Sequence, residues 1–169
     1  YVYLLSNDGT EISIKYEWCA KHVESQADEL QRVSVSTFAW SVKQLKQNKI
    51  IPVEKLSNLP SDASAEKSIF DAQGIKSVIL IPLIFKKQMV GILCGDSVLK
   101  ERKWEQDIIT LYKLVGEIIM NAMEHKKAEF HLKEHQISLE QIVKERTREL
   151  EEKNKKLDKA IKVFVGREL

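Results

Sequence analysis

The sequence predicts an α+β fold: a mainly antiparallel sheet flanked by helices and extended by a long C-terminal coiled-coil helix. Apolar segments of strand length alternate with turn residues and short helical patterns in the first part of the chain. After about residue 125, glycine and proline are missing until Gly166, and strong helix formers dominate. We therefore expect a globular domain over residues 1–124 and a helical linker over residues 125–169.

Composition excludes several classes of function. The 169 residues suffice for one or two folded units. Acidic and basic residues nearly balance, 25 against 27, which argues against a nucleic-acid-binding surface. No apolar run reaches the roughly 18 residues of a membrane span, and no signal peptide is evident, so we expect no membrane contact. Cys19 and Cys94 lack metal-ligand spacing, which indicates a reducing, cytoplasmic setting, and the strand-like opening "YVYLL" indicates an excerpt of a longer protein.

The first element predicted is a β-hairpin. The segments "YVYLLS" and "TEISIKYEWCA" flank "NDG", a sequence typical of a tight turn. In the second strand apolar and polar residues alternate, as they do in a strand with one buried face. We expect Ile12, Ile14, Tyr16 and Trp18 on the buried face and Cys19 on the polar face.

Three shorter elements follow the hairpin. Apolar residues at helical spacing behind a capping residue predict a helix, and glycine is a common residue just past a helix end. Proline has no N–H for a sheet ladder, so it is expected at an edge or at an end of a strand. In order, the elements are a helix over residues 36–48 with Ser36 or Thr37 as its N-cap, a short strand over residues 49–53 that Pro52 confines to an edge or an end, and a helix over residues 61–74 that Gly74 ends.

Two central strands and a helix complete the domain. Residues 76–85 and 89–98 are apolar on both faces, and the short polar joint "KKQ" makes them an antiparallel hairpin. From Trp104 onward the chain is helical, with an apolar stripe that we expect to pack on the sheet or on a partner. The stripe consists of Ile108, Leu111, Val115, Ile118 and Ala122.

The C-terminal helix carries a heptad pattern. An apolar stripe of two residues per heptad is too narrow for a globular core and is typical of a coiled coil. Asn154 at an a-like position favours a parallel homodimer, because it can pair with its own counterpart. The four-residue step from Leu139 to Val143 resembles a stutter, and the alternative is a solitary, solvated helix. The predicted seam is Val143, Thr147, Leu150, Asn154, Leu157, Ile161 and Phe164.

The segments "YEWCA", "GIKSVILIPLIFKKQMVGILCGDSVLKERKW" and "LVGEIIMNAMEHKKAE" together resemble a GAF domain of sensor histidine kinases. Pro82, a polar turn and Gly91 are similar to the core signature of that family, and "LEQIVKERTRELEEKNKKL" resembles its signalling helix. Two departures are the absence of the family's first helix and of a Ser or Thr cap after Trp104. The resemblance implies a sensory input module of a two-component protein, with an unknown small-molecule ligand and a downstream kinase or other output domain in the full-length chain.

No catalytic motif accompanies this resemblance. The sequence has no glycine-rich phosphate loop and no nucleophile elbow, so we expect no enzyme activity from this segment. The resemblance implies a phosphoacceptor histidine followed by an acid and Leu-Arg, and His125, His131 and His135 do not match. It also implies a Cys-His pair for bilin attachment, but Cys19 and Cys94 are followed by Ala and Gly.

Two kinds of ligand site are consistent with the sequence, a small-molecule pocket and a haem site. The resemblance implies a pocket between the sheet and the two short helices, whereas membership of an ordinary core is the alternative role for each wall residue. Haem bound through Cys19 or His22 is the second kind of site, although the odd spacing of these two residues on a strand points their side chains to opposite faces. A dimerisation scaffold without a ligand is the competing function. The candidate wall residues are Trp18, Phe38, Trp40, Phe70 and Ile79.

Overall fold

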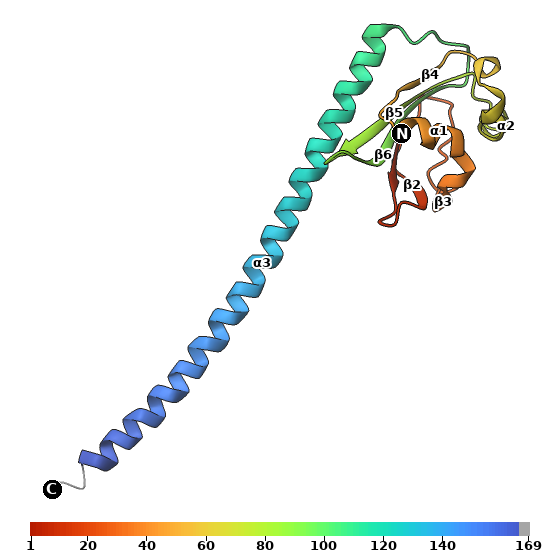
Figure 1. Cartoon of the computed structure of the whole chain (residues 1–169). Coiled ribbons are helices and arrows are strands. Elements are labelled where there is room, and N and C mark those ends of the chain that lie inside the picture. Colours follow the sequence, from red (N-terminus) through yellow and green to blue (C-terminus); the bar gives the residue numbers. More distant parts are fainter. Residues whose placement is uncertain (166–169) are drawn as a thin grey trace. The chain divides into compact units, whose positions relative to one another are not determined.

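The computed structural model describes the backbone of residues 1–165 and the side chains of residues 1–161. Residues 1–121 form one compact unit, and a second unit begins at residue 122 (Figure 1). A six-stranded antiparallel sheet has the strand order β3-β2-β1-β6-β5-β4. The strands are β1 (Val2–Leu5), β2 (Glu11–Tyr16), β3 (Val33–Ser34), β4 (Ile51–Val53), β5 (Ser77–Phe85) and β6 (Gln88–Ser97). The helices are η1 (Val35–Phe38), α1 (Ala39–Leu45), η2 (Leu56–Asn58), η3 (Ser61–Ala63), α2 (Ser64–Ala72) and α3 (Gln106–Val165).

The predicted central hairpin is confirmed as β5 and β6, which lie inside the sheet. Phe85 pairs with Gln88, so the turn consists of Lys86 and Lys87 alone. Both lysines have positive φ angles, 47° and 68°. Two residues in this conformation form a type I′ turn, whose twist matches that of the strands it joins.

The predicted first hairpin is also confirmed, as β1 and β2. Asp8 holds its turn together, because its carboxylate accepts hydrogen bonds from the Thr10 N–H at 3.1 Å and the Ser6 hydroxyl at 2.6 Å. These bonds favour the ionised carboxylate and lower the pKa of Asp8 to about 2. Gly9 supplies the positive φ of 70° that the turn needs.

The prediction of four buried residues on β2 is wrong for two of them. Ile12 and Ile14 are buried, but Tyr16 is 58% exposed and Trp18 is 83% exposed. The strand ends at Tyr16, so the alternation of faces no longer applies beyond it. The loop that follows is tied down by Glu17, whose carboxylate accepts hydrogen bonds from the N–H groups of Gln26 and Ala27.

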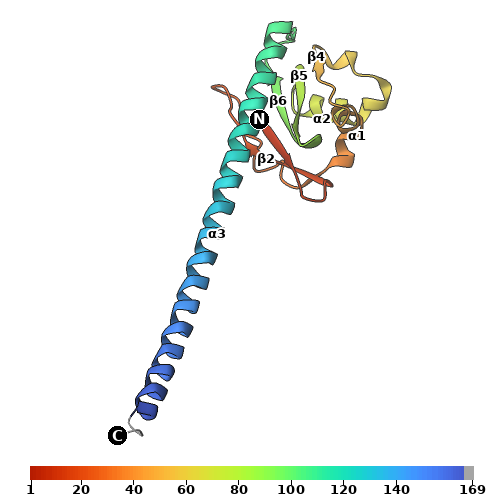
Figure 2. The same cartoon turned by 60° about the vertical axis from the view of Figure 1, so that its left-hand side comes forward.

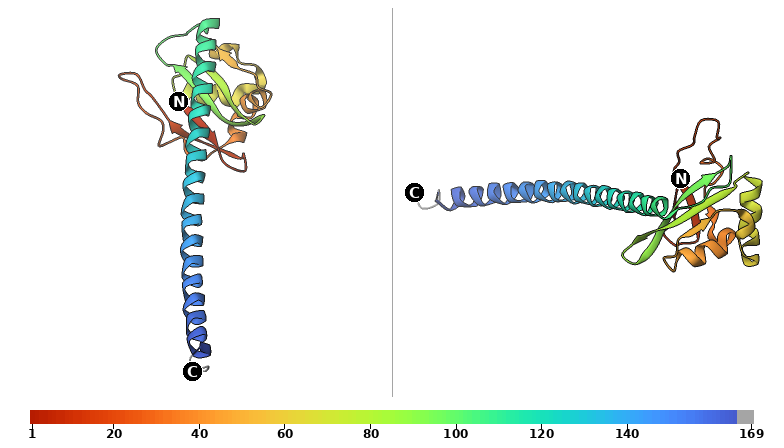
Figure 3. Two further views of the ribbon diagram at one scale, coloured as in Figure 1. Left: turned by 90° about the vertical axis from the view of Figure 1, so that its left-hand side faces the viewer. Right: turned by 90° about the horizontal axis from the view of Figure 1, so that it is seen from above.

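Helices cover both faces of the sheet. Figures 2 and 3 show α1 and α2 on one side and the first turns of α3 on the other. The side chains divide in the same way, because neighbouring strand residues point to opposite faces. The core under α1 and α2 contains Tyr3, Ile12, Ile14, Phe38, Val42, Leu45, Phe70, Val78, Leu80, Ile92 and Cys94. The core under α3 contains Val2, Ile79, Ile81, Leu83, Leu93 and Trp104, with Ile108, Ile109, Tyr112, Ile119 and Met120 packed against it.

The first turns of α3 fit closely onto the sheet. Gly116 is buried in the helix, and a Cβ at this position would lie 3.2 Å from a methyl group of Leu83. Tyr112 lies over Gly95 of β6, where any Cβ would overlap its hydroxyl and stand 2.7 Å from Cε1. Trp104 fixes the start of the helix, since its indole N–H donates to the Val53 carbonyl at 3.0 Å.

Two predicted boundaries can be compared with the structure. The helix end at Gly74 is confirmed, because α2 stops at Ala72 and Gly74 has a φ of 70°. The N-cap at Ser36 or Thr37 is wrong. The chain enters α1 through a 3-10 turn, whose cap is Ser34 with its hydroxyl accepting from the Ser36 N–H at 3.3 Å.

The second unit contains only helix among its described residues. Every residue from 124 to 161 is exposed in the single chain. Its ion pairs are short-range ones along the helix, such as Arg146 with Glu149 at 2.8 Å and Arg148 with Glu152 at 3.4 Å. Pairs of this kind contribute only tenths of a kcal/mol, so they do not replace a packing partner.

Candidate functional site

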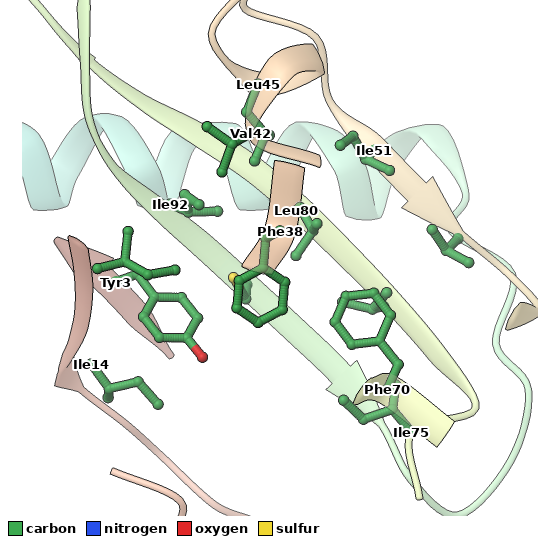
Figure 4. Packing of buried hydrophobic residues seen from close by; sticks show 14 residues of the cluster. Tyr3, Ile14, Phe38, Val42, Leu45, Ile51, Phe70, Ile75, Leu80 and Ile92 are labelled. Carbon is green, nitrogen blue, oxygen red and sulfur yellow. The ribbon is translucent and has the colours of Figure 1, made fainter. Parts of the chain in front are cut away.

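The space between the sheet and the two short helices is filled by side chains. Phe38 and Phe70 stack with their ring centroids 6.3 Å apart, in the same buried cluster as Leu80 and Ile92 of the sheet (Figure 4). Both phenylalanines are less than a tenth exposed. These two predicted wall residues are therefore members of an ordinary apolar core.

The other three wall candidates lie elsewhere. Trp40 is half-buried at the margin of the same core. Ile79 is completely buried on the opposite face of the sheet, under α3. Trp18 lies in the loop after β2 and is exposed. The structure thus brings together Phe38, Phe70 and the edge of Trp40, and it separates them from Ile79 and Trp18.

A buried carboxylate between α1 and α2 was missed by the sequence analysis. Glu66 is 1% exposed and accepts a hydrogen bond from the Ser41 N–H at 3.0 Å, in the first turn of α1. The Ser41 hydroxyl is also buried and has no hydrogen-bond partner. Helical spacing could have indicated that Glu66 is buried, because it lies four residues before Phe70 and three after Ala63, on the buried face of α2.

The haem candidates lie in an irregular loop and not on a strand. The Cys19 thiol lies 3.8 Å from the Glu24 carbonyl, and His22 is exposed with a φ of 73°. Within the described residues, no three His, Cys, Asp or Glu side chains gather as metal ligands. Cys94 is buried in β6, where loss of water raises the pKa of its thiol and keeps it neutral.

Two cavities contact the first turns of α3. One, of about 580 Å³, lies beside β5 and is bordered by Asn48, Lys113 and Glu117, with Gly116 in its wall. The other, of about 470 Å³, lies between the loop after β2, the end of β6 and α3.

The second cavity has aromatic and acidic walls. Its lining includes Tyr1, Trp18, Tyr112, Glu17 and Asp96. The Tyr1 hydroxyl donates to the Asp96 carboxylate at 2.7 Å. Displacement of water raises the pKa of Asp96 to about 6, although that hydrogen bond acts in the opposite direction. The cavity is thus a place where a small molecule could contact α3 directly.

The predicted seam is an exposed stripe on the second part of α3. Its apolar members are each at least half exposed in the single chain. Thr147 satisfies its hydroxyl internally by donating to the Val143 carbonyl at 2.8 Å. The side chain of Phe164 lies outside the described residues. The described members are Val143, Thr147, Leu150, Asn154, Leu157 and Ile161.

Known structures share the architecture of the chain. Neither a protein-family model nor a curated protein matches the sequence. A domain described as that of a two-component sensor histidine kinase from Sinorhizobium meliloti 1021 matches with a TM-score of 0.59 and 13% identity, over 78% of this chain and 82% of that one. The blue-light-absorbing PixJ GAF domain of Thermosynechococcus elongatus has a TM-score of 0.56 and 15% identity, over 77% and 79%.

A third structure agrees with these two. The photoproduct state of GAF3 from Slr1393 of Synechocystis sp. PCC6803 has a TM-score of 0.58 and 15% identity, over 75% of this chain and 84% of that one. No helix among the described residues has both the length and the apolar character to cross a membrane. The strand order, the helices on both faces and these likenesses lead to one conclusion. The chain has the GAF fold, with a long C-terminal helix.

Proposed function

We propose that the chain is a non-catalytic sensory module that relays the state of its GAF domain to an output domain through a parallel coiled-coil dimer. One observation carries the proposal: α3 belongs to the core of the first unit and also bears the exposed heptad seam. Tyr112 and Gly116 are packed on the sheet, so a change in the sheet moves or strains this helix. A histidine kinase in the full-length protein is the output that the signalling-helix pattern favours.

The relay needs two arrangements of the helix pair. A ligand can shift the output only by binding one arrangement more tightly than the other. The cavity beside Tyr112 supports a sensing role, because its occupant would contact α3. We expect the arrangements to differ most near the stutter between Leu139 and Val143, where the heptad phase changes.

The competing function is a dimerisation scaffold that binds no ligand. The filled core around Phe38 and Phe70 favours it, since this is the place where the resemblance implies a pocket. Native mass spectrometry of the chain purified from its own host separates the two. A co-purified small molecule supports sensing, whereas chains free of any ligand at every charge state support the scaffold.

Disulfide cross-linking tests the parallel pair. With Cys19→Ser as background, Leu150→Cys should form a disulfide with its own counterpart under mild oxidation, because d positions face each other in a parallel dimer. Glu152→Cys is the matched control, since its side chain points away from the seam. Equal yields for the two variants, or a monomer in sedimentation equilibrium, would refute the proposed dimer.

A further inference from the structure

One short stretch of α3 concentrates side chains that can bind a metal ion. Three of the four histidines of the chain lie within residues 125–135, namely His125, His131 and His135, and glutamates lie among them. All of these side chains are exposed in the single chain. Imidazole and carboxylate are common protein ligands of Zn²⁺ and related transition-metal ions. Which of them converge depends on the face of the helix that each one occupies.

His125 lies on the same stripe of the helix as the leucines of this stretch. Leu132 and Leu139 are one heptad apart, and His125 lies one heptad before Leu132. Glu129 follows His125 by four residues and precedes Leu132 by three, which is the alternating spacing of a coiled-coil seam. Positions four apart are neighbours on a helix, and side chains tilt towards its N-terminus, so Glu129 leans towards the turn of His125. An imidazole and a carboxylate thus occupy adjacent layers of the stripe.

Neither side chain has a charged partner in its own chain. Among residues 1–161 no ion pair involves His125 or Glu129, although Lys126 and Lys133 lie three and four residues from Glu129. In the proposed parallel dimer this stripe is enclosed between two helices, and each layer brings identical side chains together. Two facing carboxylates that have lost water are costly unless a cation lies between them.

We propose that His125 and Glu129 of two parallel chains together bind one divalent transition-metal ion, with Zn²⁺ as the representative of this class. The inference rests on the proposed parallel dimer, because one chain supplies only two of the ligands. Within the described residues of a single chain, no three metal-ligating side chains gather. Two imidazoles and two carboxylates complete the four-coordinate shell that Zn²⁺ prefers. One divalent ion also cancels the charge of the two carboxylates.

The position of this layer gives the ion a regulatory role. The first unit ends at residue 121, and the predicted stutter lies between Leu139 and Val143. His125 and Glu129 lie between these two points along the helix. Because ligands from both chains converge on one ion, its binding fixes the register of the pair there. An ion that needs both chains also tightens the dimer, and the dimer tightens the ion in return. Metal occupancy is thus an input to the relay besides any ligand of the GAF domain.

A second histidine pair on the same helix provides the matched comparison. His131 and His135 lie four residues apart, so they can chelate an ion on one helix without a partner chain. His131 also lies 3.5 Å from Glu134. Neither histidine falls on the stripe that Leu132 and Leu139 define. The two pairs therefore predict different stoichiometries, one ion per two chains for the seam and one ion per chain for the exposed pair.

Titration of the full chain with Co²⁺ tests the site, in a Cys19→Ser background that removes the accessible thiol. The visible absorption bands of tetrahedral Co²⁺ should saturate at one ion per two chains and disappear when Zn²⁺ is added in excess. His125→Ala and Glu129→Gln should each weaken Co²⁺ binding at least about tenfold, because each removes two of the four ligands. His131→Ala and His135→Ala are the controls and should change it by less than about twofold. Circular dichroism checks that each variant keeps its helix.

Sedimentation equilibrium gives a second readout that does not depend on colour. At a free Zn²⁺ concentration about ten times its own dissociation constant, the dissociation constant of the dimer should fall about tenfold. The same Zn²⁺ concentration should change the dissociation constant of His125→Ala by less than about twofold. In EDTA, His125→Ala should dimerise at least as well as the background protein, because it removes a polar side chain from the seam.

The oligomeric state in EDTA separates this inference from the proposed function. A dimer that binds one Co²⁺ per two chains through His125 and Glu129 supports both. A monomer in EDTA that Zn²⁺ converts to a dimer also supports the metal site and makes the ion a condition for the pair. A dimer without Co²⁺ bands, or with bands lost only in His131→Ala or His135→Ala, overturns the metal site and leaves the relay intact. The polar layer then only fixes register, as predicted for Asn154. A chain that stays monomeric with and without metal overturns both proposals.

Discussion

Substitution of Gly95 by alanine tests whether α3 is held against the sheet as described. A Cβ at Gly95 would overlap the hydroxyl of Tyr112 and stand 2.5 Å from its Cζ and 2.7 Å from its Cε1. The tyrosine ring must move, and it is already packed edge-on against Trp104, with centroids 6.1 Å apart. Overpacking of this kind costs about 1–3 kcal/mol, and replacing a strand glycine regains about 0.5–1 kcal/mol. We therefore expect Gly95→Ala to lower the free energy of unfolding by about 1–2 kcal/mol.

The double mutant gives the sharper result. Tyr112→Ala removes a half-buried ring and should cost about 2 kcal/mol by itself. Adding Gly95→Ala to it should cost almost nothing more, because the new methyl group then meets no ring. The coupling free energy should thus be about 1–2 kcal/mol. Urea unfolding followed by tryptophan emission measures all four proteins. One fixed protein concentration is used, because the proposed dimer would dissociate as it unfolds.

A second glycine supplies the control. Gly74 has a φ of 70° and no atom within 4 Å of a Cβ built on it. Gly74→Ala should therefore destabilise the protein by about 1 kcal/mol through backbone strain alone, with no coupling to Tyr112→Ala. If Gly95→Ala is neutral, or if its cost is the same with and without the Tyr112 ring, the packing of α3 on β6 described above is refuted.

Three further predictions concern the turn, a carboxylate and the thiols. Lys87→Gly should stabilise the β5–β6 turn by about 0.5 kcal/mol, measured as a Tm rise of about 1–2 °C, because glycine adopts the observed φ of 68° without strain; an unchanged or lower Tm contradicts this. The pKa of Asp96 is raised to about 6, so the folded state favours its protonated form, and stability should fall as the pH rises from about 4 to 6. Asp96 is partly exposed, so we expect this decrease in the free energy of unfolding to be less than about 1 kcal/mol and to be absent in Asp96→Asn. Urea unfolding at several pH values measures it, and the same change of unfolding free energy with pH in both proteins would contradict the prediction. In the native protein a thiol reagent at pH 8 should titrate Cys19 alone and reach buried Cys94 only after unfolding, so two fast thiols would contradict the burial.

The sheet and its central hairpin could be predicted because their signals are local. Two apolar segments joined by two lysines, the "NDG" turn and Gly74 each specify backbone geometry within a few residues. The predicted edge position of the Pro52 strand is confirmed for the same reason, since a missing N–H excludes a central place. The alternation of apolar and polar residues on β2 wrongly predicted that Tyr16 and Trp18 are buried, because periodicity does not reveal where a strand ends.

The candidate site could be predicted less well, because it depends on contacts between distant segments. Ile79 has the same apolar character as Leu80, and only the pleat decides that it lies under α3 and not beside Phe38. Glu66 reads as an ordinary helix-surface residue until its partner, the Ser41 N–H, is known. The stripe from Ile108 to Ala122 is apolar as predicted, but spacing alone did not reveal which residues contact the sheet. Of the stripe only Ile108 packs on the core under α3, and the other contacts are made by Ile109, Tyr112, Ile119 and Met120 beside it.

The two outermost strands of the sheet limit how copies of this chain can aggregate. β3 has only two residues, and β4 has three with Pro52 in the middle. Neither offers a row of free N–H and C=O groups onto which another chain could add a strand. Fibril growth by strand addition is therefore disfavoured at both borders of the sheet. Even when a helix unfolds transiently, the sheet remains a poor template for polymerisation.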